Sequence, residues 1–363
     1  MKVLSIIGTR PEAIKMASVI RALSHSQGIE SRVLSTGQHR EMLKQVLGVF
    51  NITPDYELDV MQYDQTPLAV LATILQRIEV VLREFQPDWV LVQGDTTTVL
   101  GATIAAVYTR CRVGHVEAGL RTYDRDNPFP EEINRVLVDH ASQLYFAPTQ
   151  TAREALLKEN LPDNCILVTG NTVIDALRYI GSQQHLLPPI SFPKNKRLLL
   201  VTAHRRENHG EPLKNIFNAL RQIATREDVH IVYPVHRNPN VALLAHEMLS
   251  DVENIQLLEP LDYLSFVAWM KQACLILTDS GGIQEEAPAL GVPVLVLRTV
   301  TERPEAVVAG VAKLVGTDTD LIVSETNQLL DDPVLYDAMA NAVNPFGDGT
   351  AAEQIVEALW LEK

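Results

Sequence analysis

The chain has 363 residues, of which 46% are hydrophobic and 21% charged, and its formal net charge is −14. This composition is typical of a soluble globular protein, and at roughly 150 residues per domain the length predicts two domains. The acidic balance argues against nonspecific binding to nucleic acid or to anionic membranes. It does not exclude a phosphate ligand, because a local basic pocket can lie within an acidic protein.

The apolar runs and the cysteines indicate the compartment. No stretch is apolar over the roughly 18 residues that a membrane span needs, and the apolar run at the N-terminus is too short for a signal peptide. Cys111, Cys165 and Cys274 have no metal-type spacing and are predicted to be small buried apolar side chains. We therefore expect a cytoplasmic protein.

Short β-rich runs alternate with longer helical patterns through the first half of the chain. Strands are predicted at 3–7, 32–35, 89–93, 113–116, 144–146 and 166–169. Helices are predicted between them, at 12–23, 40–50, 67–85, 98–108, 131–140 and 151–159. Continuous apolar strands that alternate with helices indicate a parallel sheet covered on both faces, in a doubly wound α/β domain.

The same pattern restarts after a proline-containing stretch at 187–194. Strands are predicted at 198–202, 230–234, 255–257, 275–278, 294–297 and 312–314. The expected fold class is α/β, with two doubly wound Rossmann-like domains at 1–170 and 191–345 and a hinge at 171–190. A last helix within 346–363 is expected to pack back on the first domain. Ligands of such sheets bind at the carboxyl ends of the strands, so we expect the domains to face a cleft.

The first strand ends in a basic turn, Gly8-Thr9-Arg10-Pro11-Glu12-Ala13-Ile14-Lys15. Gly8 permits a tight turn, and a proline suits the first turn of a helix. Arg10 and Lys15 place two positive charges at the helix start, where a phosphate would also meet the helix dipole. The alternative is that both cations pair only with Glu12 or with solvent.

Three carboxylates follow at strand ends or in the loop after them. Asp95, Glu117 and Glu131 are predicted to converge at one edge of the first domain, and converging carboxylates suit general acid/base chemistry. As alternatives, Asp95 caps the following helix and Glu131 only occupies a favourable first turn. Glu117 is harder to explain structurally because apolar residues flank it. Glu132 and Arg135 are three residues apart and can pair on a helix surface.

The second domain supplies histidine and arginine at two strand ends. His204 and Arg205 follow its first strand, and His236 follows its second. Arginine binds phosphates bidentately, and histidine donates a hydrogen bond or a proton, so the set suits a diphosphate. Neither histidine has a second ligand at metal spacing, so we predict no metal. Phe266 either stacks on a base or belongs to the core.

The run at 279–286 follows an apolar strand and begins a short helix. Its Ser280-Gly281-Gly282 turn leaves backbone N–H groups at the positive end of a helix dipole, which is a geometry that binds phosphate. Glu285 and Glu286 lie one turn further on, where a carboxylate can accept hydrogen bonds from sugar hydroxyls. The alternative is an ordinary capped helix, because a single glycine-rich turn is a weak motif.

Taken together and in this order, the motifs resemble those of the bacterial non-hydrolysing UDP-N-acetylglucosamine 2-epimerases over essentially the whole chain. The segments that carry the resemblance are 8–12, 94–98, 115–121, 130–135, 170–172, 204–207 and 279–286. The resemblance implies the two-domain glycosyltransferase-B architecture, a homodimer, a UDP-sugar in the interdomain cleft and no redox cofactor.

The implied activity is the interconversion of UDP-N-acetylglucosamine and UDP-N-acetylmannosamine, which supplies N-acetylmannosamine units for cell-surface polysaccharide. UDP would leave by anti elimination with loss of the C2 proton, giving 2-acetamidoglucal, and would add back after C2 is protonated from the opposite face. By resemblance, the catalytic residues are Asp95, Glu117, Glu131 and His204.

The resemblance also implies two binding sites. The UDP site would comprise Arg10, Lys15, His204, Arg205, His236, Ser280, Gly281 and Glu286, with Glu286 on the ribose. A second UDP-N-acetylglucosamine would act as an allosteric activator on a segment that includes Gln38, His39 and Met42, with Arg135 nearby. One departure from the family pattern is Gln93, where close relatives often have histidine; glutamine can still hydrogen-bond.

Two other functions remain open. A hydrolysing epimerase would release N-acetylmannosamine and UDP, and its members generally lack the pattern found at 36–42. A glycosyltransferase or a nucleotide-sugar-binding module on the same fold needs only the motifs of the second domain. The three carboxylates of the first domain therefore argue against that second alternative.

Overall fold

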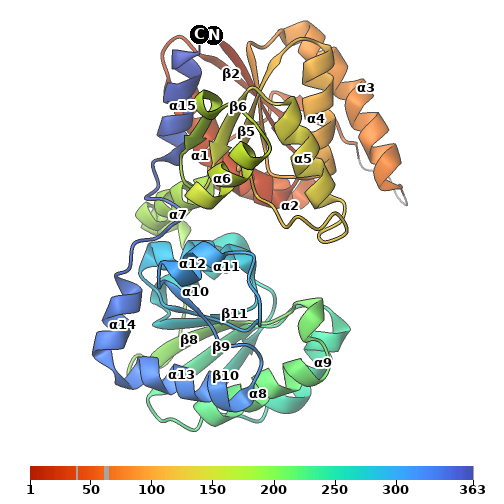
Figure 1. Ribbon diagram of the computed structural model, residues 1–363. Helices are drawn as coiled ribbons and strands as arrows, with labels where there is room; N and C mark the ends of the chain where they lie inside the picture. The colour runs from red at the N-terminus through yellow and green to blue at the C-terminus, as the bar shows by residue number, and fades with distance from the viewer. Residues whose placement is uncertain (38–39, 61–64, 363) are drawn as a thin grey trace. The chain divides into compact units, whose positions relative to one another are not determined.

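The computed structural model describes residues 1–37, 40–60 and 65–362. The chain divides into two compact units (Figure 1). Unit 1 consists of Met1–Tyr179 with Phe346–Lys363, and unit 2 consists of Ile180–Pro345. Each unit contains one parallel sheet with helices packed against it. The expected α/β class, with two doubly wound sheets, is confirmed.

The sheet of unit 1 has seven strands within the described residues, in the order β3-β2-β1-β4-β5-β6-β7. Their bounds are β1 (Lys2–Ile7), β2 (Glu30–Ser35), β3 (Tyr56–Glu57), β4 (Trp89–Gln93), β5 (Arg112–Val116), β6 (Leu144–Ala147) and β7 (Ile166–Val168). All neighbouring strands are parallel, as in the pairing of Ile7 with Ser35. The strand order reverses between β1 and β4, and ligands of such sheets bind at that switch point.

Three helices of unit 1 begin directly after a threonine that caps them. The helices of this unit are α1 (Arg10–His25), α2 (Arg40–Val49), α3 (Pro67–Phe85), α4 (Thr97–Tyr108), α5 (Glu131–Ala141), α6 (Gln150–Lys158), α7 (Thr172–Ser182), which crosses the unit boundary, and α15 (Ala351–Leu361). Thr66, Thr96 and Thr149 each accept a hydrogen bond from the first turn of the helix that follows. Helix α15 packs against α1, so the end of the chain belongs to unit 1.

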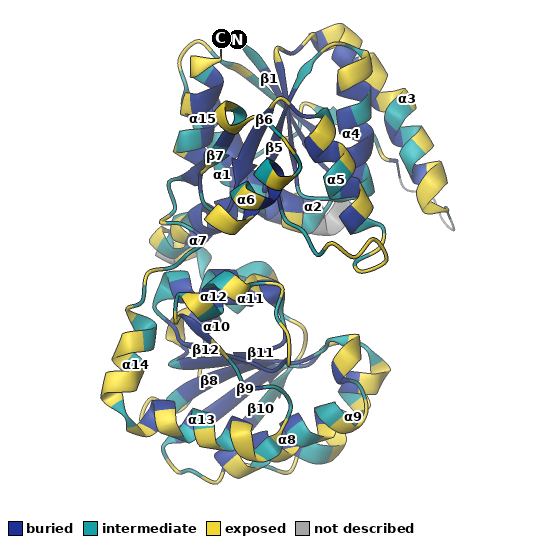
Figure 2. Ribbon diagram, in the orientation of Figure 1, coloured by how far each residue is buried: buried dark blue, intermediate teal, exposed yellow. Residues whose placement is uncertain are grey.

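The central strands of each sheet are buried along most of their length, as Figure 2 shows in dark blue. In unit 1, Ile6, Val90 and Val92 of the sheet pack with Ile74 and Ile78 of α3. Burial of both sheet faces explains why the strands appear in the sequence as continuous apolar runs rather than as alternating patterns.

The sheet of unit 2 has six strands within the described residues, in the order β10-β9-β8-β11-β12-β13. They are β8 (Arg197–Thr202), β9 (Val229–Pro234), β10 (Ile255–Leu258), β11 (Leu275–Thr278), β12 (Val294–Val296) and β13 (Ala312–Leu314). The helices are α8 (Glu211–Ile223), α9 (Pro239–Leu249), α10 (Tyr263–Gln272), α11 (Gly281–Glu286), α12 (Pro304–Val308), α13 (Thr319–Asp331) and α14 (Pro333–Ala340). This sheet also reverses, between β8 and β11.

Two local features differ from the expectation, β3 and the cysteines. Strand β3 has only two residues, too few to leave a periodic pattern in the sequence. The stretch expected as a hinge, 171–190, contains α7 and the boundary between the units, and Val173, Ile174 and Leu177 of α7 are buried at helical spacing. The three cysteines are free and only half-buried. Across the described residues, no helix is long and apolar enough to cross a membrane.

Candidate active site

The turn after β1 is packed too tightly for a side chain at Gly8. A Cβ at that position would overlap the Thr98 hydroxyl and would lie 2.7 Å from Thr36 Oγ1. Beneath the turn, the buried Glu12 carboxylate accepts hydrogen bonds from Gly8 N at 2.6 Å and from Thr96 Oγ1 at 2.7 Å. Glu12 therefore joins the turn after β1 to the turn after β4, which are the two loops at the switch point of unit 1.

Glu12 is a structural carboxylate rather than a partner of the nearby cations. Burial raises its pKa to about 7, although hydrogen bonds from Thr96 and Gly8 oppose the shift. The alternative in which Arg10 and Lys15 pair with Glu12 is therefore wrong for Lys15, which reaches Glu117 instead. Arg10 is half-buried at the start of α1, and it has no ion pair among the residues that the structure describes.

Glu117 is the most constrained carboxylate of unit 1. It follows β5, is 8% exposed, and has a φ of 66°, a left-handed backbone conformation that is uncommon for residues other than glycine. Its Oε1 accepts hydrogen bonds from Lys15 Nζ at 2.5 Å and from Asn171 Nδ2 at 3.0 Å. Its Oε2 accepts one from Gln93 Nε2. Strained backbone conformations of this kind are often found at functional sites, so the observation supports a chemical role for Glu117.

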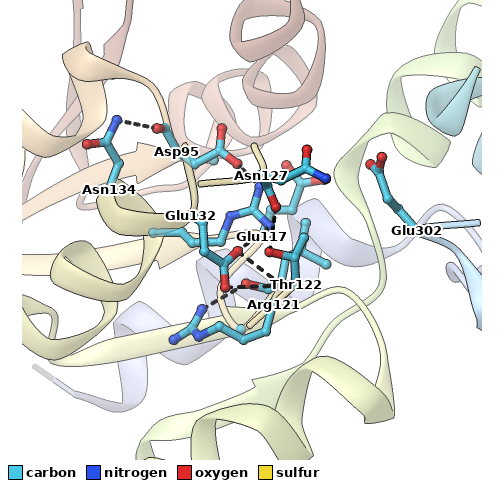
Figure 3. A network of polar contacts seen from close by, with 12 residues as sticks. Asp95, Glu117, Arg121, Thr122, Asn127, Glu132, Asn134 and Glu302 are labelled. Carbon is cyan, nitrogen blue, oxygen red and sulfur yellow. Dashed lines mark hydrogen bonds and ion pairs between the residues drawn. The ribbon is translucent and has the colours of Figure 1, made fainter. Parts of the chain in front are cut away.

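Asp95 lies in the loop after β4, beside Glu117. A Cβ at Gly94 would be 3.8 Å from Glu117 Oε2, and Figure 3 shows Asp95 and Glu117 in one network of polar contacts. The Asp95 carboxylate pairs with Arg135 at 2.5 Å, and Asn134 Nδ2 donates to the Asp95 carbonyl at 2.8 Å. Because the cap of α4 is Thr96, the alternative in which Asp95 serves only as a helix cap is wrong.

Helix α5 presents its first turn to this network. Glu132 is buried and accepts hydrogen bonds from the backbone N–H groups of Thr122 and Tyr123, at 3.1 and 2.9 Å, while Arg135 approaches it at 3.4 Å. The pair of Glu132 and Arg135 therefore lies inside the site and not on a helix surface. Glu131 is half-buried at the first position of α5, and no described residue forms an ion pair or side-chain hydrogen bond with it.

A buried cluster of charged residues stabilises the loop that carries Glu117. His115 Nδ1 lies 2.6 Å from Asp139 Oδ1, and its Nε2 lies 2.8 Å from the Gly94 carbonyl. Arg121 pairs with the second Asp139 oxygen at 2.8 Å and with Glu159 through two bonds of 2.7 Å. Burial opposes ionisation of Asp139, but His115 and Arg121 hold its pKa below the usual range. His115 and Arg121 lie in a recognised motif, whereas nothing in the sequence distinguishes Asp139 from other polar residues of α5.

In unit 2, Asp279 organises the loop after β8. It is 0% exposed at the end of β11, and its Oδ2 accepts hydrogen bonds from the backbone N–H groups of His204 and Arg205, each at 2.7 Å. Asn208 Nδ2 donates to the same oxygen at 3.0 Å, while Oδ1 lies 3.5 Å from His204 Nδ1. The two strands at the switch point of unit 2 thus hold His204 and Arg205 in fixed positions.

His204 and His236 form one surface of unit 2. Their rings are stacked, with centroids 5.1 Å apart and an interplanar angle of 11°. Burial lowers the pKa of His204, and the neighbouring His236 and Arg205 lower it further, although Asp279 opposes them. The surroundings of His204 therefore disfavour its protonated form.

The Ser280-Gly281-Gly282 turn begins α11, as expected, with Ser280 as the N-cap. A Cβ at Gly281 would lie 3.8 Å from the Arg205 guanidinium, so the turn and Arg205 face the same space. The two glutamates at the end of α11 differ in their surroundings: Glu285 is buried and paired with Arg303, whereas Glu286 accepts a hydrogen bond from Tyr263 at 2.9 Å.

Some predicted residues have a less defined setting. Phe266 is half-buried on α10, three residues after Tyr263. Gln38 and His39 lie outside the described residues, and Met42 belongs to α2.

Within 1–37, 40–60 and 65–362, no group of three or more His, Cys, Asp or Glu side chains could hold a metal ion. The sequence analysis assigned no site role to Asn171 or Tyr263, because their partners Glu117 and Glu286 are distant in the chain.

Comparisons with known proteins agree across the whole chain. The family model described as UDP-N-acetylglucosamine 2-epimerase matches residues 21–360. The chain is 52% identical to the UDP-N-acetylglucosamine 2-epimerase of Escherichia coli K12, covering 99% of this chain and 98% of that protein. It is also similar to the crystal structure of the Neisseria meningitidis UDP-GlcNAc 2-epimerase bound to UDP-GlcNAc, with 48% identity, a TM-score of 0.90 and full coverage of both chains. The Methanocaldococcus jannaschii UDP-GlcNAc 2-epimerase in complex with UDP-GlcNAc and UDP is 37% identical, with a TM-score of 0.78, covering 99% of this chain and 100% of that chain.

Proposed function

The chain belongs to the UDP-N-acetylglucosamine 2-epimerase family, and we propose that it interconverts UDP-N-acetylglucosamine and UDP-N-acetylmannosamine without net hydrolysis. The observation that carries the proposal is Glu117: a buried carboxylate in a strained backbone conformation, held by Lys15, Gln93 and Asn171. A sugar- or nucleotide-binding module has no need of such a group, whereas proton transfer at carbon does.

The chemistry explains why carboxylates and cations are both needed. No carbonyl group activates the C2 proton, so a carboxylate alone is too weak a base to remove it from the ground state. The bond between C1 and UDP must therefore break ahead of the loss of the C2 proton, so that positive charge develops at C1, as in glycoside cleavage. Anti elimination would then give 2-acetamidoglucal and UDP, and protonation of C2 from the opposite face with return of UDP would give the epimer.

We assign the proton transfers at C2 to the carboxylates of unit 1. Asp95 and Glu117 lie in neighbouring strand-end loops, and the ion pair with Arg135 keeps Asp95 oriented. Glu131, at the start of α5, completes the proposed set. The family resemblance supports all three residues, and the contacts of Glu117 make it the first candidate for the base.

We assign the diphosphate and the nucleoside mainly to unit 2. Arg205, the stacked His204 and His236, and the Ser280 turn supply donors at the carboxyl ends of the strands. With its protonated form disfavoured, His204 can still donate a hydrogen bond to the diphosphate, which stabilises a leaving group that must come back. By family resemblance, we also assign Arg10 and Lys15 to UDP binding. We assign the ribose to Glu286, which accepts a hydrogen bond from Tyr263, and stacking on the base to Phe266.

Regulation and assembly follow the family pattern in this proposal. A second UDP-N-acetylglucosamine would activate the enzyme through Gln38, His39, Met42 and Arg135. The presence of this segment also supports the non-hydrolysing reaction over the hydrolysing one.

We propose a cytoplasmic homodimer. The exposed apolar side chains of α3 and α4 offer surface for a second copy, among them Leu68, Val80, Val107 and Tyr108. Light scattering at several concentrations tests the assembly.

Incubation with UDP-N-acetylglucosamine in deuterated water tests the reaction. We expect a mixture of both UDP-sugars with deuterium at C2. Free N-acetylmannosamine and UDP as the main products would establish the hydrolysing alternative instead. A lasting absence of deuterium at C2 would exclude both epimerase reactions and leave a transferase or a binding module. A panel of related UDP-sugars in the same assay identifies the preferred substituents at C3 and C6.

A further inference from the structure

The motif Gly170-Asn171-Thr172 belongs to the family pattern, but no step of the proposed reaction takes place on its residues. Asn171 lies directly before α7 and is 2% exposed, and its Nδ2 donates a hydrogen bond to Glu117 Oε1 at 3.0 Å. We propose that Asn171 is a positioning residue that orients the Glu117 carboxylate and keeps it ionised. The inference rests on the proposed function, because it requires Glu117 to take part in the reaction.

The two ends of the Asn171 amide have separate tasks. Its Oδ1 accepts a hydrogen bond from Val173 N at 3.1 Å and so caps the first turn of α7. Its Nδ2 donates to Glu117. Rotating the amide by half a turn would point its oxygen at a carboxylate and its N–H groups at another N–H. Only one orientation therefore satisfies both neighbours. The oxygen supports the fold, and the nitrogen supports the site.

The backbone that carries Asn171 is itself fixed by the returning chain. Asn171 N donates to the Phe346 carbonyl at 2.7 Å. Gly170 and Gly347 lie against each other, since a Cβ on either one would be 3.0 Å from the Cα of the other. Both glycines also have positive φ, of 86° and 108°. The segment therefore has little freedom to move, so the amide is presented to Glu117 in one position.

Asn171 acts together with two other donors. Lys15 shares Oε1 with it, and Gln93 donates to Oε2. Each N–H that points at a carboxylate stabilises its ionised form and limits its rotation. Loss of the Asn171 donor would leave Glu117 less fixed and more readily protonated, and both effects weaken a base.

Asn171→Asp separates the two tasks within a single variant. Aspartate keeps an oxygen for Val173 N and is an equally good cap, so the fold is retained. It replaces the Nδ2 donor that faces Glu117 with a negatively charged oxygen. We expect kcat for epimerisation to fall about 10- to 100-fold, the range of one hydrogen bond to a charged group. The KM and the affinity for UDP should stay the same, and the acid limb of the pH–rate profile should move to higher pH. Asn171→Ser, a short uncharged cap without the amide donor, should show a smaller fall of kcat.

Two controls complete the test. Asn341→Asp makes the same charge change at an exposed residue directly after α14, whose side-chain amide donates to the Asp337 carbonyl, and it should leave kcat unchanged. In a Glu117→Gln background, Asn171→Asp should cause no further loss, because the donor acts through Glu117. Wild-type kcat in Asn171→Asp, or the full additional loss in the Glu117→Gln background, would overturn the positioning role. A wild-type enzyme without C2 exchange would instead refute the proposed function itself.

Discussion

Glu12 couples the stability of unit 1 to pH, and Glu12→Gln isolates that coupling. The pKa of this carboxyl is raised by burial from 4.5 to about 7 in the folded protein. The folded state therefore binds a proton more tightly than the unfolded state between these two pH values, and stability falls as pH rises through that window. At about 1.4 kcal/mol for each tenfold change in proton affinity, the loss is roughly 3 kcal/mol by pH 8.

Glutamine retains the local contacts of Glu12 and has no charge to lose. Its amide oxygen can accept from Gly8 N, and its amide N–H can donate to the Thr96 hydroxyl. The free energy of unfolding of Glu12→Gln, measured relative to the wild type, should therefore increase by roughly 3 kcal/mol between pH 4.5 and pH 8.

The assay must report on unit 1. In a Trp269→Phe background, the two remaining tryptophans, Trp89 and Trp360, both lie in that unit. Urea unfolding followed by their fluorescence at a series of pH values gives the two stability profiles. Parallel profiles for the Trp269→Phe protein and its Glu12→Gln derivative would show that Glu12 titrates normally, and the account of the buried carboxylate would then be wrong.

Three further predictions concern the site. Glu117→Gln should lower the rate of C2 deuterium exchange by about 100-fold or more, which is the usual effect of losing an acid/base group. The affinity for UDP, measured by calorimetry, should stay nearly the same. A protein that fails to fold would indicate a structural role instead. Gly8→Ala should destabilise unit 1 by about 1–3 kcal/mol in urea unfolding, because the added methyl group meets Thr98; unchanged stability would refute this packing. Ser280→Ala or Glu286→Gln should release UDP and 2-acetamidoglucal during turnover, detectable by chromatography, whereas a change in KM alone would argue against a role in retaining UDP.

The positions of the strand-end loops could be predicted because the physics behind them is local. Buried parallel strands leave continuous apolar runs, and the polar residue that follows such a run marks the carboxyl edge of the sheet. Glu117 could be recognised in this way, since a carboxylate between apolar residues has few structural explanations. The Ser280 turn could be recognised as well, from the change of a strand pattern into a helix start.

The partners of these residues could not be predicted, because each contact joins distant parts of the chain. An asparagine before a helix suggests a cap, and Asn171 is one, but its second bond reaches a residue 54 positions away. Glu12 has the sequence signature of a favourable first-turn acid and proves to be buried beneath two loops. The adjacent Glu285 and Glu286 cannot be told apart until Arg303 is seen to pair with the first.

The central claim is that the bond between C1 and the diphosphate breaks and re-forms while UDP is held. Positional isotope exchange tests it directly, with UDP-N-acetylglucosamine that carries ¹⁸O in the bridge between C1 and the β-phosphorus. The account predicts that ¹⁸O in the recovered UDP-sugars moves from the bridge into the non-bridging β-phosphate positions as epimerisation proceeds. Epimerisation with all of the ¹⁸O still in the bridge would contradict it.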